Sequence, residues 1–239
     1  MNDLLALAIE AHGGLDRWNS FTKLQADVSF GGAIWQVKQQ PDLLQNNRIE
    51  IGTHAQRLAI VPLVRSDLRS TFVPERLALE DADGNAIEAW ENPETAFVSH
   101  VRETPWKPLH VAYFVSEALW TYMTSPFLYT YPGFENEEIE PWHENGETWR
   151  RLKVTFPDYI KSHTPTQITH FGPDGLMRRH DYVVDVLGGA TGANYTTDYR
   201  EFQGIMMPTR RRVYAYDDAV QKVPDPLLVS LDFDTIRLS

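Results

Sequence analysis

The sequence predicts an α+β fold made mainly of antiparallel β-strands, in which a large sheet curves over a buried central helix. The first observation behind this prediction is that residues 109–124 are apolar on almost every side of a helical wheel. The second is that the flanking segments alternate between apolar and polar residues and are separated by short turn signals, as in successive β-hairpins. We therefore expect one domain that covers residues 1–239.

The central helix is expected to be enclosed by protein and not by lipid. A helix of this length is about 24 Å long, which is shorter than the ~30 Å hydrocarbon core of a bilayer. We therefore expect no stable membrane insertion, and the rest of the chain must supply the surface that buries the helix. Its apolar residues form two stripes, of which one comprises Leu109, Ala112, Tyr113, Trp120 and Met123 and the other Val111, Val115, Ala118, Leu119 and Tyr122.

The N-terminal part of the chain should begin with two short helical segments. Residues 2–12 are amphipathic and precede Gly13-Gly14, which favours a helix that ends there. A second turn is expected at residues 15–20, with Trp18 as its buried anchor.

Strands should follow these helices. Residues 24–30 alternate between apolar and polar side chains, which predicts a half-buried strand. The segment 33–39 should return as a second strand, with Trp35 and Val37 on one face. Further strands are expected at 46–51, 57–64 and 68–73, before a hairpin around residues 81–85.

The remaining elements are a short helix and a long run of hairpins. Asn92-Pro93 favours a helix start, because asparagine caps helices well and proline is tolerated in the first turn. Ser125-Pro126 should end the central helix. Asn145-Gly146 is a hairpin signal. Strands are expected at 138–142, 147–156, 167–171, 176–187, 193–202, 205–216 and 227–238.

A polar cluster is predicted beside the central helix. On a regular strand, Arg178, His180 and Tyr182 share one face with apolar neighbours, so this face should point inward. Buried polar groups need partners, and the helix offers His110 and Glu117. The hypothesis is therefore a cluster of His110, Glu117, Arg178 and His180. The alternative is that these are core residues with ordinary hydrogen-bond partners, or that one end of the helix is exposed to solvent.

An apolar cavity next to this cluster would be lined by aromatic side chains. Large aromatic side chains often line ligand cavities, and this chain is 12% aromatic. They are equally suited to filling a β-rich core. The predicted ligand-binding residues are Trp35, His110, Phe114, Glu117, Trp120, Arg178, His180 and Tyr182, with Phe127 as a further candidate.

The overall charge argues against nucleic-acid partners. The formal net charge is −11 and the pI is near 5.1, so the chain should repel phosphate groups. The one basic cluster, residues 210–212, lies in a predicted strand and is interpreted as a solvated edge or face.

The sequence offers no pattern that would hold a metal or a cofactor. It has no cysteine, no phosphate-binding loop and no G-x-S-x-G motif, and His163, His170 and His180 lack the spacing of zinc ligands. We therefore expect no metal and no cofactor. The N-terminal segment has neither the positive region nor the long apolar run of a signal peptide, so a cytoplasmic location is expected. The oligomeric state is not predicted.

The organisation of the chain resembles a known family. An opening A-x-x-A-H-G-G-x-x-x-W segment, formed by Ala8, residues 11–14 and Trp18, leads into alternating strands. A helix is enclosed mid-chain, and the last strand contains residues 232–234, Asp-Phe-Asp. This pattern is similar to the bacterial LolA/LolB-like lipoprotein-carrier superfamily. The resemblance implies a curved antiparallel half-barrel whose concave side is filled by helices, with an apolar cavity that holds acyl chains in the carriers.

Three functional interpretations follow. The first is non-enzymatic binding of a hydrophobic small molecule or lipid between the sheet and the helix. The second is an enzyme that uses His180 and Glu117 as an acid–base pair in the same cavity. The third is an interaction module whose helix merely fills the core. The first is favoured because no nucleophile, base and orienting group can be recognised together.

Overall fold

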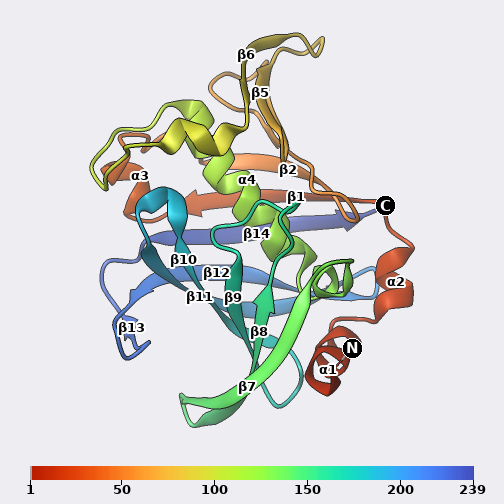
Figure 1. Ribbon diagram of the computed structural model, residues 1–239. Coiled ribbons are helices and arrows are strands. Elements are labelled where there is room, and N and C mark those ends of the chain that lie inside the picture. The colour runs from red at the N-terminus through yellow and green to blue at the C-terminus, as the bar shows by residue number, and fades with distance from the viewer. Residues whose placement is uncertain (1) are drawn as a thin grey trace.

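The computed structural model describes residues 2–239 and contains one fourteen-stranded sheet in which every neighbouring pair is antiparallel (Figure 1). The predicted antiparallel sheet is thus confirmed. Within the described residues, the two edge strands β6 and β7 each pair with a single neighbour, so the sheet is open. The strand order is β6-β5-β4-β3-β2-β1-β14-β12-β11-β10-β9-β8-β7, with β13 attached to β12.

The strands form two meanders that meet where β1 pairs with β14. The N-terminal meander comprises β1 (Lys23–Gly31), β2 (Asn46–Gly52), β3 (Leu58–Val61), β4 (Arg69–Val73), β5 (Arg76–Glu80) and β6 (Ala86–Glu91). The C-terminal meander comprises β7 (Glu135–Glu144), β8 (Glu147–Thr155), β9 (Thr166–Phe171), β10 (Met177–Val184), β11 (Ala190–Phe202), β12 (Ile205–Tyr216), β13 (Lys222–Val223) and β14 (Val229–Leu238).

The helices are short except for one. The α-helices are α1 (Asp3–Ala11), α2 (Leu15–Asn19), α3 (Ile34–Val37) and α4 (Pro108–Thr124), and the 3-10 helices are η1 (Pro93–Phe97), η2 (Phe127–Thr130) and η3 (Asp185–Leu187). The side chain of Asn2 caps α1 by accepting a hydrogen bond from the Leu5 backbone N–H at 2.8 Å.

The long helix α4 is buried at every position from Leu109 to Thr124. Pro108 begins it in the position that tolerates proline, and the backbone N–H of Lys107 donates to His110 Nδ1 at 3.0 Å. The chain leaves the helix at Ser125, before Pro126. No helix among residues 2–239 is long and apolar enough to cross a membrane.

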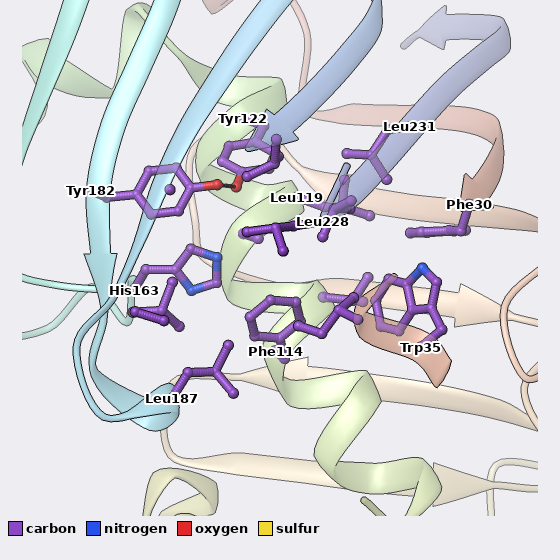
Figure 2. Close-up of a pocket in the computed structure, with 18 of the residues that line it drawn as sticks. Phe30, Trp35, Phe114, Leu119, Tyr122, His163, Tyr182, Leu187, Leu228 and Leu231 are labelled. Carbon is purple, nitrogen blue, oxygen red and sulfur yellow. Dashed lines mark hydrogen bonds between the residues drawn. The ribbon is translucent and has the colours of Figure 1, made fainter. Parts of the chain in front are cut away.

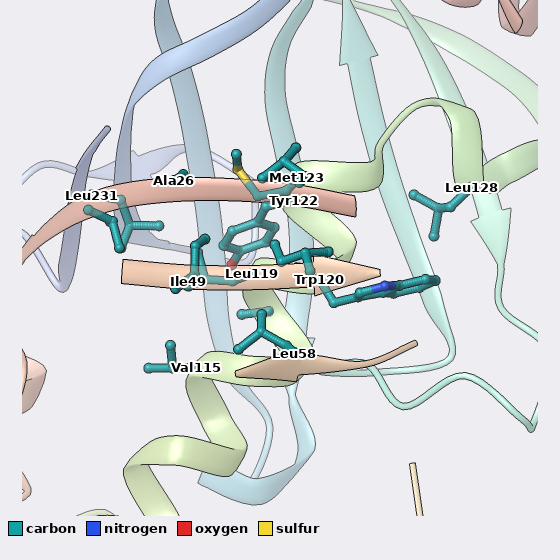
Figure 3. Packing of buried hydrophobic residues seen from close by; sticks show 14 of the residues in the cluster. Ala26, Ile49, Leu58, Val115, Leu119, Trp120, Tyr122, Met123, Leu128 and Leu231 are labelled. Atoms are coloured by element: carbon teal, nitrogen blue, oxygen red, sulfur yellow. The ribbon is translucent and has the colours of Figure 1, made fainter. Parts of the chain in front are cut away.

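One side of α4 packs against the N-terminal meander. Figure 3 shows Ile49 and Leu58 of β2 and β3 lying against Val115 and Leu119 of the helix. The helix also contacts β4 and β5. This packing leaves the other side of α4 for the C-terminal meander, where the candidate site lies.

The predicted strand at 33–39 is wrong. Gly32 turns the chain with φ +109°, a conformation that favours glycine, and residues 34–37 then form the single turn α3. The backbone N–H groups of Ala33 and Ile34 donate to the carbonyls of Leu227 and Leu228, which fixes this turn beside β14. Trp35 is buried as expected, but Val37 is exposed.

Candidate ligand-binding site

An apolar pocket lies between α4, α3 and the C-terminal strands, as Figure 2 shows. Its volume is about 60 Å³. Larger hollows occur elsewhere, but the largest of those described is lined by several charged side chains, including Glu94, Asp158 and Lys161. The lining of the apolar pocket comprises Phe30, Ile34, Trp35, Phe114, Val115, Ala118, Leu119, Tyr122, His163, Tyr182, Val184, Leu187, Ala190, Thr191, Gly192, Val213, Leu228, Val229 and Leu231.

The helix contributes one face to the pocket. Phe114, Ala118 and Tyr122 follow each other at intervals of four residues, which places them on one side of α4. Val115 and Leu119 widen this face. The small side chain of Ala118 lies between two aromatic residues, and this leaves space at the centre of the pocket wall.

Aromatic rings form two opposite walls of the pocket. On one side His163 lies between Phe114 and Tyr182, with ring centroids 4.9 Å from each. On the other side Trp35 contacts Phe114 edge-on at 6.3 Å, and its Nε1 donates to the Gly31 carbonyl at 2.9 Å. These contacts hold the rings in place, because each is packed against another ring or tied to backbone.

The Tyr182 ring occupies space that a glycine leaves free. Gly192 faces Tyr182 across β10 and β11, and a Cβ atom on residue 192 would lie 2.4 Å from a ring carbon. Glycine therefore permits the ring to lie over β11. The Tyr182 hydroxyl then reaches that of Tyr122, and the two form a hydrogen bond inside the pocket (Figure 2).

Both tyrosines are neutral at neutral pH. Burial raises the pKa of Tyr122 to about 12, and burial also raises the pKa of Tyr182 well above its ordinary value. The pocket wall therefore carries no phenolate, and it suits an uncharged chain.

The rim of the pocket is formed by partly exposed apolar side chains. Ile34, Leu187 and Leu228 are each intermediate in exposure, and Ala190 at the start of β11 is exposed. These residues come from three separate connections, so side chains at the rim have fewer neighbours than those of the core. They mark the side on which the pocket lies nearest to solvent.

Three of the predicted ligand-binding residues line this pocket: Trp35, Phe114 and Tyr182. Their contact with a ligand stays a prediction. The other predicted residues lie elsewhere, and each departs from the prediction for a different physical reason.

The predicted pairing of Glu117 with His180 is wrong. The carboxylate of Glu117 instead accepts a hydrogen bond from His163, with Nδ1 and Oε1 2.7 Å apart, and both side chains are buried. Tyr113 lies next to the same carboxylate. His163 is contributed by the connection between β8 and β9, which the sequence pattern did not assign to any element.

Arg178 is excluded from the predicted cluster by a β-bulge. Met177 pairs with Phe171 and Arg179 pairs with His170, so β10 carries one extra residue. The bulge shifts the alternation, and Met177 is buried in place of Arg178. Arg178 instead forms ion pairs near the surface with Asp174 at 2.9 Å and Glu147 at 3.2 Å.

His110 and Trp120 also lie outside the pocket. His110 is in the first turn of α4, where it accepts from the Lys107 backbone and packs against Trp90 and Phe97. The Trp120 indole points into the core, as Figure 3 shows, and donates to the Gly52 carbonyl at 2.9 Å. Trp120 belongs to the helix stripe that faces away from the pocket.

His180 is buried behind the pocket wall. Its ring meets those of Tyr122 and Tyr182 edge-on, with centroids 6.0 and 5.2 Å away. Neither ring nitrogen has a hydrogen-bond partner among the described residues. Burial lowers the pKa of His180 to about 3, so this imidazole is neutral.

Several pocket residues were not predicted from the sequence, among them Ala118, Leu119, Tyr122, His163, Leu187, Val213 and Leu231. The helix residues could have been found from the sequence, because Val115, Ala118, Leu119 and Tyr122 lie on one stripe of the helical wheel. For His163 and Leu187 no local signal exists, since both lie in connections that only the tertiary fold brings to the helix.

The described residues contain no group of three or more His, Cys, Asp or Glu side chains that could hold a metal ion. The pocket offers apolar contact and the hydroxyls of Tyr122 and Tyr182, which suits binding through shape and apolar surface.

Comparison with known proteins identifies the fold and gives no activity. No protein-family model matches the chain, and no curated protein does either. Three solved structures are similar over nearly the whole chain. A LolA superfamily protein from Nitrosomonas europaea has a TM-score of 0.54 at 9% identity, and covers 99% of this chain and 92% of its own.

The other two structures agree with the first. A DUF1329 family protein from Desulfovibrio piger has a TM-score of 0.54 at 11% identity, with 99% of this chain and 92% of that chain covered. A domain from Vibrio parahaemolyticus assigned to outer membrane lipoprotein sorting has a TM-score of 0.56 at 10% identity, with 98% and 92% covered. The resemblance seen in the sequence is thereby confirmed at the level of the fold: the chain has a LolA-like fold.

Proposed function

We propose that this protein binds a hydrophobic small molecule or lipid, without catalysis, in the apolar pocket between α4 and the C-terminal strands. The observation that carries the proposal is an apolar pocket with a partly exposed apolar rim. A similar fold occurs in a domain assigned to lipoprotein sorting, which supports an apolar ligand. Because fold alone does not give function, the proposal depends on the pocket.

We infer that the sheet curves around α4 as a half-barrel. Contacts of the helix with β3, β4 and β5 on one side, and the pocket against β10, β11, β12 and β14 on the other, support this arrangement. It would let one helix form the floor of the pocket while strands form its walls.

The pocket must widen to take a ligand. Its volume of about 60 Å³ is well below the ~300 Å³ at which small-molecule sites begin. We propose that the rim side chains of Leu187 and Leu228 move outward, because both are partly exposed. Transfer of one CH₂ group from water contributes about 0.8 kcal/mol, so affinity should rise about fourfold for each CH₂ added to a straight-chain alcohol.

Blocking the rim should weaken binding strongly without harming the fold. Ala190 is exposed and lines the pocket, so Ala190→Trp should cover the opening with an indole. We expect the unmodified protein to bind the neutral fluorescent probe N-phenyl-1-naphthylamine and 1-decanol to displace this probe. The affinity of Ala190→Trp for the probe should be lower by a factor of about ten or more.

The matched control is Ala86→Trp, at an exposed alanine of β6 that lies outside the pocket. It should bind the probe as the unmodified protein does. The proposal is rejected if the unmodified protein does not bind the probe, or if both tryptophan variants bind it equally well.

A further inference from the structure

The arginine triplet of β12 places one positive charge inside the protein. Arg210 and Arg212 form ion pairs with Asp232 at 3.1 and 2.8 Å on the outer face of the sheet. Arg211 points the other way and is 1% exposed. Among residues 2–239 it forms no ion pair, and its Nε and Nη1 atoms have no hydrogen-bond partner.

The surroundings of Arg211 are tyrosines and not carboxylates. Its Nη2 donates to the Tyr122 carbonyl at 2.7 Å, and the guanidinium lies 4.8 Å from the centroid of the Tyr122 ring. Burial lowers the pKa of Arg211, and the ionisable side chains that act on it in the opposite direction are Tyr199, Tyr122, Tyr182 and Tyr129. An arginine does not lose its proton in proteins, so among the described residues this buried charge is offset by the ring face and the carbonyl of Tyr122.

Two further polar side chains on the same face of the sheet lack partners. His180 and Asn194 are directly opposite each other on β10 and β11, and both are buried. Neither ring nitrogen of His180 and neither amide atom of Asn194 forms a hydrogen bond of ordinary geometry within the described part of the chain, and the Asn194 amide lies near the Tyr122 hydroxyl. Buried polar groups are normally satisfied, so three such neighbours indicate a site for a ligand.

This polar group adjoins the apolar pocket. Tyr122 and Tyr182 line the pocket, and the guanidinium of Arg211 stacks on the Tyr122 ring. The hydrogen bond between the two tyrosine hydroxyls closes the pocket at this point (Figure 2). Separating the hydroxyls would extend the pocket toward Arg211.

We propose that the ligand is an amphiphile with one carboxylate, whose chain fills the apolar pocket and whose carboxylate binds Arg211. The Asn194 amide and the tyrosine hydroxyls are placed to donate to the same carboxylate. This inference rests on the proposed function, and it adds the chemical class of the ligand.

The charge count favours a carboxylate over a phosphate monoester. Burial lowers the pKa of His180 to about 3 and raises the pKa values of Tyr122, Tyr129, Tyr182 and Tyr199, so Arg211 supplies the positive charge of this polar group in a desolvated environment. A carboxylate brings one negative charge, which this arginine neutralises. A phosphate monoester at pH 7 brings close to two, and the second would be buried without a partner.

The test compares decanoate, 1-decanol and decyl phosphate as competitors of N-phenyl-1-naphthylamine at about pH 8, where decanoate is ionised. In the unmodified protein, decanoate should bind about tenfold or more tighter than 1-decanol, since hydrogen bonds to charged groups are the stronger ones. Decyl phosphate should bind more weakly than decanoate.

In Arg211→Met the preference for decanoate should vanish, while 1-decanol binds within about threefold of its original affinity. The control Arg212→Met alters the adjacent arginine on the outer face and should keep the preference. If Arg211→Met does not fold, the comparison of decanoate with 1-decanol in the unmodified protein still tests whether the site prefers a carboxylate.

Two failures can be told apart. If 1-decanol binds but decanoate binds no better, or if Arg211→Met keeps the preference, the carboxylate site is wrong and the apolar pocket stands. If neither the probe nor 1-decanol binds, the proposed function itself is wrong.

Discussion

Replacing Trp120 with alanine should lower the free energy of unfolding by about 3–5 kcal/mol. The indole is fully buried at 0% exposure in the middle of α4. Its Nε1 donates to the carbonyl of Gly52, the last residue of β2, at 2.9 Å and to that of Ala55, in the connection between β2 and β3, at 3.2 Å. The substitution therefore leaves a cavity and two buried carbonyls that lose a donor, and both effects destabilise the folded state.

Urea unfolding followed by circular dichroism measures this loss. Trp90→Ala is the comparison, because Trp90 is half-buried at the sheet edge and donates only to Glu88. If Trp120→Ala costs no more than Trp90→Ala, α4 is not the centre of the core. Since Trp120 lies outside the pocket, the folded variant should still bind the naphthylamine probe.

The second large effect is a loss of stability as the pH falls from about 6.5 to 4. Burial lowers the pKa of His12 to about 4 and that of His180 to about 3, and burial also lowers the pKa of His170 well below its ordinary value. Below pH 6.5 the unfolded chain binds protons at these positions while the folded protein does not. The three histidines therefore stabilise the fold fully above pH 6.5 and less as the pH falls.

One buried acid opposes this trend. Burial raises the pKa of Asp181 to about 6, although Arg179 lies 2.6 Å away and acts in the opposite direction. Between about pH 4 and 6 the folded protein keeps a proton on Asp181 that the unfolded chain releases, so this residue favours the fold at lower pH. For these four residues, three protons minus one leave about two protons, which corresponds to about 2.7 kcal/mol per pH unit between about pH 5 and 6.

His180→Phe removes one of the titrating groups that make the stability depend on pH. His180 has no hydrogen-bond partner among the described residues, so phenylalanine removes the titration without breaking a bond. The stability change per pH unit should fall by about 1.4 kcal/mol, measured by urea unfolding at pH 5 and 6. Thr169→Val, at the neighbouring position on β9, should keep the original slope. Equal slopes in both variants would contradict the account.

The sequence predicted the antiparallel sheet well because its signals are local. The alternation of apolar and polar residues and the turn sequences can each be recognised within a few residues. Asn145-Gly146 is such a turn, and its φ values of +52° and +78° suit a tight hairpin. The errors are also local in origin. A bulge at Arg178 placed Met177 and not Arg178 on the inner face of β10, and Gly32 turned the chain into α3 where a strand was expected.

The site could be predicted only in part, because most of its polar geometry is set by tertiary contacts. Phe114 and Tyr182 lie on regular elements whose faces can be read from periodicity. The partner of Glu117 is His163, which comes from a connection that the pattern left unassigned. The single-domain organisation and the cytoplasmic location stay predictions.

The most direct test of the central claim is a crystal structure of the protein with a bromine-labelled decanol. The bromine should give an anomalous peak within about 4 Å of side chains such as Phe114, Leu119 or Val213, between α4 and the C-terminal strands. A peak confined to the outer face of the sheet, or an unchanged pocket with no bound bromine, would contradict the proposal that this pocket holds an apolar chain.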